Sequence, residues 1–167
     1  MKIPTTRVKE LRNQSGAGVM DCKNALLEAE GDIEKALELL KQKGCLLAQK
    51  KAGRAATEGV VEAYIHTGRK IGALVEVNCE TDFVARTDEF KKLAHHLAMQ
   101  IVAMSPQFIS KEEISEGSDI EPQSACLLLQ PCIKEPDKTI QDIINETIAK
   151  VGENIKVNRF ARFETGS

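Results

Sequence analysis

The chain lacks any long hydrophobic run. Its longest apolar stretches, such as Leu127 to Leu129, are far shorter than the roughly 20 residues that a helix needs to span a membrane. The opening residues Met1 to Pro4 do not form the charged and then apolar pattern of a signal peptide. We therefore expect a protein that does not contact membranes and that is cytoplasmic.

Paired cysteines are also lacking. The chain has five cysteines, an odd number at irregular spacing and without a C-x-x-C motif: Cys22, Cys45, Cys79, Cys126 and Cys132. This pattern favours reduced thiols over a disulfide framework. No convergent Cys, His, Asp or Glu spacing indicates a metal site. Neither G-x-x-x-x-G-K-[ST] nor G-x-G-x-x-G occurs, so we expect no bound cofactor or nucleotide held by such loops.

Positive charge is scarce in the larger part of the chain. Residues 56–167 carry 12 Lys and Arg against 18 Asp and Glu, whereas residues 1–55 carry 11 against 7. Nucleic-acid phosphates repel an acidic body, and the basic part has no dense Lys/Arg run with interleaved aromatics. We therefore expect no direct binding to nucleic acid and a protein partner instead.

Three short helices are predicted in residues 1–44. Thr5 or Thr6 can cap the first helix, which ends near Gly16. The second buries one face with i, i+3, i+4, i+7 spacing, formed by Cys22, Ala25, Leu26 and Ala29. Asp32 caps the third, which is expected to end at Gly44. Such a module has a thin apolar core and is often a docking unit for another surface.

A short basic helix over residues 45–55 is predicted to link this module to a core of residues 56–167. The core begins with two strand-like runs, 58–66 and 70–78, joined by a turn at Thr67-Gly68-Arg69. An amphipathic helix from about Thr87 to Met104 is expected to pack on this hairpin.

The remaining core residues alternate between loops and regular elements. Residues 110–124 are polar and acidic and are expected to form a mobile loop, followed by a strand over 126–133. Thr139 begins a helix that Gly152 ends, and residues 153–163 form a last strand. Strands mixed with segregated helices predict an α+β fold, with an antiparallel sheet covered by helices on one face.

Phe83 lies where one pattern gives way to another. Period-two alternation ends near Val77, and helical spacing begins near Phe90. Segments between regular elements lie at the surface and often carry function, so Phe83 is a candidate contact for another protein. The alternative is that Phe83 packs into the local core, as most aromatic side chains do.

One catalytic interpretation treats Cys79 as a nucleophile and His95 or His96 as its base. Neighbouring residues of a helix point about 100 degrees apart, and no third group is placed to orient a histidine as a base. Solvent-facing histidines are the better explanation. A binding protein rather than an enzyme is therefore predicted.

Two long motifs resemble the signatures of the elongation factor Ts family. The first follows Leu11-Arg12 and reads Gly16-Ala17-Gly18-Val19-Met20-Asp21-Cys22-Lys23-Asn24-Ala25-Leu26. The second reads Glu76-Val77-Asn78-Cys79-Glu80-Thr81-Asp82-Phe83-Val84-Ala85-Arg86. A third segment, Gly152-Glu153-Asn154-Ile155, also resembles the family. Together these matches span nearly the whole chain.

The resemblance implies a guanine-nucleotide exchange factor that binds elongation factor Tu and promotes GDP release without covalent chemistry. In the family, a helical module similar to a ubiquitin-associated domain docks on the partner's GTPase domain. This implies docking contacts from Val19, Met20 and, less directly, Lys23. It also implies that a second segment, Thr81-Asp82-Phe83-Val84, reaches the partner's magnesium and phosphate region. Phe83 would enter an apolar pocket there, and Asp82 would make polar contacts beside it.

The chain is similar to short members of the family, which lack a second core half. One core half leaves a sheet face or edge uncovered, so a homodimer is expected. The rival hypothesis is an adaptor, similar to ubiquitin-associated domains, that binds peptides or other proteins. That hypothesis gives no role to the Thr81–Val84 segment.

Overall fold

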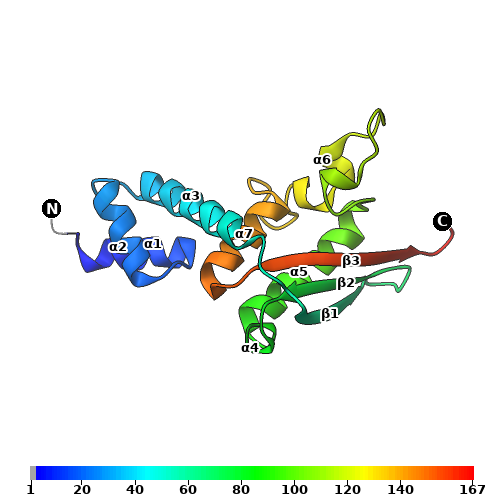
Figure 1. Ribbon diagram of the computed structural model, residues 1–167, viewed down its shortest axis with the longest axis horizontal. Coiled ribbons are helices and arrows are strands. Elements are labelled where there is room, and N and C mark those ends of the chain that lie inside the picture. Colours follow the sequence, from blue (N-terminus) through cyan, green and yellow to red (C-terminus); the bar gives the residue numbers. More distant parts are fainter. Residues whose placement is uncertain (1–2) are drawn as a thin grey trace.

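The computed structural model describes residues 3–167 as an elongated molecule, with a helical module at one end and a sheet at the other (Figure 1). The longer elements, in chain order, are α1 (Thr5–Ser15), α2 (Val19–Glu28), α3 (Ile33–Lys51), β1 (Glu58–Ile65), β2 (Ile71–Cys79), α5 (Asp88–Met104), α7 (Ile140–Val151) and β3 (Ile155–Glu164). A four-residue helix, α4 (Asp82–Ala85), lies between β2 and α5. This arrangement confirms the α+β fold.

Helices α1, α2 and α3 pack around a small apolar cluster of their own: Val8, Leu11, Cys22, Ala25, Leu26, Ala29 and Ala36. Gly16 ends α1 in the left-handed conformation (φ 66°), as expected. Asp32 caps α3 by accepting a hydrogen bond from the Lys35 backbone N–H at 3.0 Å, again as expected. The expected threonine cap of α1 is wrong, because Pro4 is the N-cap and the threonines lie in the first turn.

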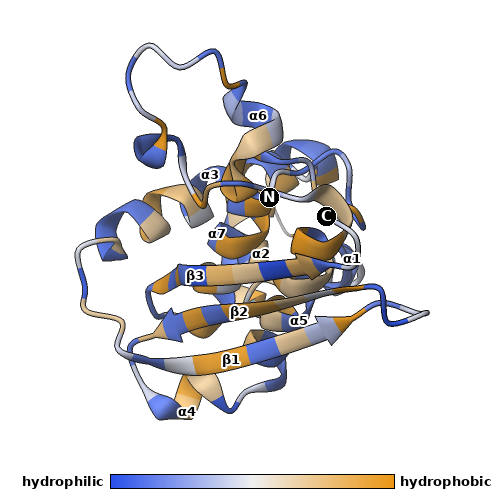
Figure 2. Ribbon diagram, turned by 90° about the vertical axis from the view of Figure 1, so that its right-hand side faces the viewer, coloured by the Kyte–Doolittle hydropathy of each residue, from blue (hydrophilic) through white to orange (hydrophobic). Residues whose placement is uncertain are grey.

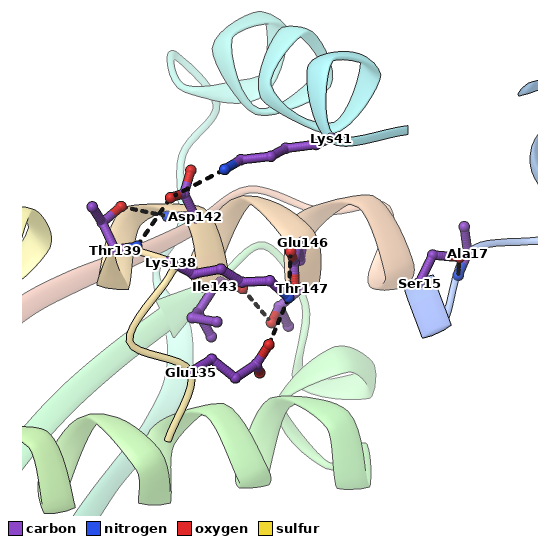
Figure 3. Close-up of polar contacts among 10 residues, drawn as sticks. All are labelled: Ser15, Ala17, Lys41, Glu135, Lys138, Thr139, Asp142, Ile143, Glu146 and Thr147. Carbon is purple, nitrogen blue, oxygen red and sulfur yellow. Dashed lines mark hydrogen bonds and ion pairs between the residues drawn. The ribbon is translucent and has the colours of Figure 1, made fainter. Parts of the chain in front are cut away.

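Helix α3 does not end at Gly44. It continues to Lys51, and Gly44 is buried where α3 crosses α7. A Cβ at Gly44 would lie 3.7 Å from the Ala149 Cβ, which is an ordinary van der Waals distance, so the two helices meet here with room for a methyl group. Figure 3 shows Lys41 of α3 reaching Asp142 of α7, with 3.6 Å between Nζ and Oδ2.

Of the residues predicted as a separate basic helix, 45–51 are the last turns of α3, and 52–55 lie beyond its end. The close contact with α7 overrides the local stop signal that glycine provides. The division into a docking module (1–44), a linker (45–55) and a core (56–167) stays a prediction.

The sheet has three antiparallel strands in the order β1-β2-β3. Gly68 (φ 91°) and Arg69 (φ 57°) form the turn between β1 and β2, as the glycine predicted. Helix α5 covers one face, where Val75 and Val77 are buried against it. In Figure 2 the three strands lie in front of the helices, so the opposite face is bare. This confirms the sheet covered on one face.

The predicted strand over residues 126–133 is wrong. Residues Leu127–Leu129 form a short 3-10 helix, which follows the four-residue helix α6 (Pro122–Ala125). The backbone N–H groups of Leu127 and Leu128 donate to the carbonyls of Phe108 and Ile109 at 2.9 and 3.0 Å. A neighbouring loop thus satisfies these backbone groups, and the apolar run packs with Leu127 buried and Leu128 and Leu129 half-buried, without joining the sheet.

Helix α7 and strand β3 follow the expected pattern. Thr139 and Asp142 form a capping box at the start of α7, and Gly152 (φ 76°) ends it. Strand β3 then pairs with the central strand β2 along its whole length, with one bulge. Within residues 3–167, no helix is long and apolar enough to cross a membrane.

Candidate functional site

Phe83 stands out from the surface on helix α4. Its side chain is 77% exposed, whereas the next residue, Val84, is 4% exposed and belongs to the core. Thr81 caps the helix, and its Oγ accepts a hydrogen bond from the Val84 N–H at 3.4 Å. The cap sets the helical phase so that Val84 points inward and Phe83 outward. The alternative that Phe83 packs into the local core is wrong.

Asp82 lies beside Phe83 and pairs with Arg86 one turn later, with 2.8 Å between Oδ2 and Nη2. Both side chains are largely exposed, so water competes for this pair, and such pairs contribute only a few tenths of a kcal/mol. The Asp82 carboxylate is therefore available to a partner at little cost. An exposed aromatic with an adjacent charge is typical of an anchor at a protein interface.

The segment that carries Phe83 is held by residues that follow helix α7. The Glu153 carboxylate accepts hydrogen bonds from the Thr81 N–H at 3.0 Å and from its Oγ–H at 2.6 Å. The Asn154 N–H donates to Glu80 Oε1 at 2.8 Å. The second and third motifs are thus in direct contact. Their spacing in the sequence gave no sign of it, and the roles of Glu153 and Glu80 were missed.

A second exposed apolar surface lies on helix α2. Val19 is 50% exposed and Met20 62%, and Lys23 is exposed on the same helix. Leu27 is also exposed, one turn after Lys23 and two turns after Met20, so it extends the same face. Leu27 was not among the residues predicted for this surface, although its i+7 spacing from Met20 places both on one helix face.

The structure does not bring the two exposed surfaces into one cavity. Figure 1 places α2 in the helical module and α4 beneath the sheet, near the start of β1. Across the described residues, no three His, Cys, Asp or Glu side chains are grouped to hold a metal ion. The structure thus presents two separate exposed apolar surfaces, one on α2 and one on α4.

The catalytic interpretation of Cys79 finds no support in the geometry. Cys79 is buried, and its Sγ–H donates to the Thr81 carbonyl at 3.2 Å. Burial, together with the charge of Glu153, raises the pKa of Cys79 to about 11, so the thiol is protonated near neutral pH. His95 instead contacts Glu62 at 2.9 Å, and His96 contacts Lys134 at 2.6 Å.

Comparisons with known proteins agree on one family. The family model described as "Elongation factor TS" matches residues 8–121. The elongation factor Ts of Carboxydothermus hydrogenoformans is 50% identical over 194 residues, covering 98% of this chain and 89% of the relative. That of Caldanaerobacter subterraneus subsp. tengcongensis is also 50% identical, covering 98% and 97%. That of Desulforamulus reducens is 49% identical, covering 99% and 90%.

The aligned length of 194 residues exceeds the 167 residues of this chain. The relatives therefore contain residues without a counterpart here. The chain nevertheless covers most of the length of each relative, so the similarity is not confined to one shared domain.

Proposed function

The chain belongs to the elongation factor Ts family, and from this premise we propose that it acts in the cytoplasm as the guanine-nucleotide exchange factor of elongation factor Tu. It binds the GDP-bound partner and promotes GDP release during protein synthesis. No covalent step is needed, because the factor acts by binding. The observation that carries the proposal is the exposure of Phe83 on a capped helix inside the second family motif.

Exchange follows from competition between two binding equilibria. Bound magnesium and the backbone around the phosphates stabilise GDP electrostatically, so a factor that displaces them weakens GDP binding. In this proposal Phe83 enters an apolar pocket of the partner's GTPase domain, and Asp82 makes polar contacts beside it. Thr81 and Val84 hold the helix that presents them. The coupling is reciprocal: bound GDP weakens the affinity of elongation factor Tu for the exchange protein as many fold as the exchange protein weakens its affinity for GDP.

The helical module supplies the docking surface in this scheme. Val19, Met20 and Lys23 contact the GTPase domain, and the exposed Leu27 extends the same face. The module has its own small apolar cluster, which supports its treatment as a unit of residues 1–44 attached to a core of residues 56–167. Residues 45–51 then continue α3 as a helix, and residues 52–55 connect its end to β1.

We further propose that two copies associate through the bare face of the sheet. Two rows of cross-strand neighbours on that face are apolar: Ile65, Gly72 and Phe163 in one row, and Ala63, Leu74 and Ala161 in the next. The large side chains among them are exposed. A contiguous apolar patch of this kind is typical of an interface, and the same patch on two copies can form an isologous contact.

Stopped-flow release of a fluorescent GDP from elongation factor Tu tests the proposed activity directly. We expect nanomolar to micromolar amounts of the protein to accelerate release. The adaptor hypothesis predicts no acceleration at any concentration, so an unchanged release rate would reject the exchange function in favour of that alternative.

A further inference from the structure

Helix α4 is too short to hold Phe83 in place without outside support. It contains only four residues, and a single helical turn is unstable in isolation because nucleation costs more than one hydrogen bond returns. Phe83 is exposed and adds no packing of its own. The orientation of this side chain therefore depends on the buried Val84 and on the residues that fix the Thr81 cap.

Glu153 fixes that cap with both oxygens of one carboxylate. One oxygen accepts from the Thr81 N–H at 3.0 Å and the other from the Thr81 Oγ–H at 2.6 Å. With its hydrogen donated to Glu153, the Thr81 Oγ presents its lone pairs to the Val84 N–H. Hydrogen bonds to a charged acceptor are stronger than neutral ones, so Glu153 orients the capping hydroxyl.

Asn154 connects the same segment to the end of helix α3. Its N–H donates to Glu80 at 2.8 Å, and its side-chain amide donates to the Arg54 carbonyl at 2.8 Å and to the Ala52 carbonyl at 3.4 Å. Arg54 in turn lies 3.6 Å from Glu80. The Asn154 N–H, followed by the charges of Arg54 and Lys51, lowers the pKa of Glu80, which keeps this carboxylate ionised at neutral pH.

We propose that Glu80, Glu153 and Asn154 form a clamp in which Glu153 is a positioning residue for nucleotide exchange: it holds helix α4, and with it Phe83, in a fixed orientation relative to the end of α3. The inference rests on the proposed function. Ordering a loose anchor at the moment of binding costs free energy, so a clamped Phe83 binds with a smaller penalty. The clamp also fixes the position of Phe83 relative to the docking surface on α2, because α3 runs from the helical module to the clamp.

Hydrogen exchange measured by NMR on the intact chain tests the clamp without reference to activity. In Glu153→Ala, the amides of Ala85 and Arg86, which bond to the carbonyls of Thr81 and Asp82, are expected to exchange about tenfold faster. The control is Glu28→Ala, which removes a surface glutamate paired with Lys43 at 2.9 Å and far from α4 in sequence. Unchanged protection of Ala85 and Arg86 in Glu153→Ala would overturn the clamp.

A double-mutant cycle tests the link to exchange. Glu153→Ala should reduce GDP release from elongation factor Tu about tenfold at subsaturating protein, and Glu153→Gln, which keeps one acceptor oxygen, should lose less. In a Phe83→Ala background the substitution should have no further effect, because there is no anchor left to position. An equal loss in both backgrounds would overturn the positioning role.

The two measurements separate the inference from the function on which it rests. Wild-type protein that fails to accelerate GDP release would overturn the proposed function and the role of the clamp in exchange. Hydrogen exchange would still decide whether Glu153 holds α4.

Discussion

Phe83 and Phe90 lie seven residues apart and have opposite environments. Phe83 is exposed on α4, whereas Phe90 is completely buried in the first turn of α5. Each helix has its own threonine cap, Thr81 for α4 and Thr87 for α5. The second cap restarts the helix with a new phase, so the two phenylalanines do not share a face. One ring is left for a partner and the other fills the core.

This contrast predicts different consequences for the same substitution. Phe83→Ala should weaken binding to elongation factor Tu by about 2 to 4 kcal/mol, as expected for an aromatic anchor, and exchange should slow as a result. The free energy of unfolding should stay nearly unchanged. Phe90→Ala should instead lower the free energy of unfolding by about 3 to 5 kcal/mol. Urea unfolding and GDP release on both variants check this. A Phe83→Ala protein that is strongly destabilised yet still active would contradict the assignment.

At the scale of the elements, α3 joins the module to the core. Its first half packs in the module, and Gly44 and Ala48 lie on the side that meets the core. The contact with α7 needs a residue without a bulky side chain at Gly44, but it does not need positive φ. Gly44 therefore serves packing and not chain reversal.

Replacing Gly44 distinguishes a role in helix packing from a role in chain reversal. Gly44→Ala should raise the free energy of unfolding by about 0.5 to 1 kcal/mol, because glycine is a poor helix former and the added Cβ would make only ordinary contacts. Gly16→Ala is the matched control and should destabilise, since Gly16 has φ 66°, a backbone conformation that residues with a Cβ rarely adopt. Destabilisation by Gly44→Ala would mean that the contact between α3 and α7 has no room for a methyl group at this residue.

Helix α2 carries the proposed docking surface, which a single charge should disrupt. Met20→Asp should weaken binding to GDP-bound elongation factor Tu by about tenfold or more, because an apolar contact would then bury an unpaired carboxylate. Leu46→Asp on α3 is the control, as Leu46 is also an exposed apolar residue but lies outside this surface. Titration of the partner with each variant measures the affinities. Equal affinities would rule out α2 as the docking element.

For the whole molecule, the important feature is the uncovered sheet face. Its apolar rows lie toward the β1–β2 turn, whereas an ion pair between Glu76 and Arg159 (2.7 Å) lies further along β2 and β3. The outer face of β2 thus changes from apolar to charged along its length. A second copy would cover the apolar part and leave α4 and Phe83 accessible to partners.

Sedimentation equilibrium tests this assembly. The protein should form a homodimer at micromolar concentration, and Leu74→Asp should shift it to monomer, because a carboxylate in the centre of the apolar rows would be buried without a partner. Leu46→Asp should leave the dimer intact. A wild-type monomer at these concentrations with full exchange activity would mean that one core half suffices.

Local sequence signals determined several helix caps and turns. Asp32, the Thr139 and Asp142 pair, and the glycines at 16, 68 and 152 predicted helix ends and turns correctly, because capping and positive φ depend on the few residues next to them. The long motif around Phe83 likewise identified the family and its candidate anchor before the fold was known.

Tertiary structure decided what depends on contacts between distant segments. Packing on α7 carried α3 through Gly44, and a loop at Phe108 satisfied the backbone of Leu127, so an expected break and an expected strand did not form. The outward direction of Phe83 and its support by Glu153 required residues about 70 positions apart to meet. Burial, hydrogen bonding across the chain and the bare sheet face are properties of the assembled fold, which no local pattern encodes.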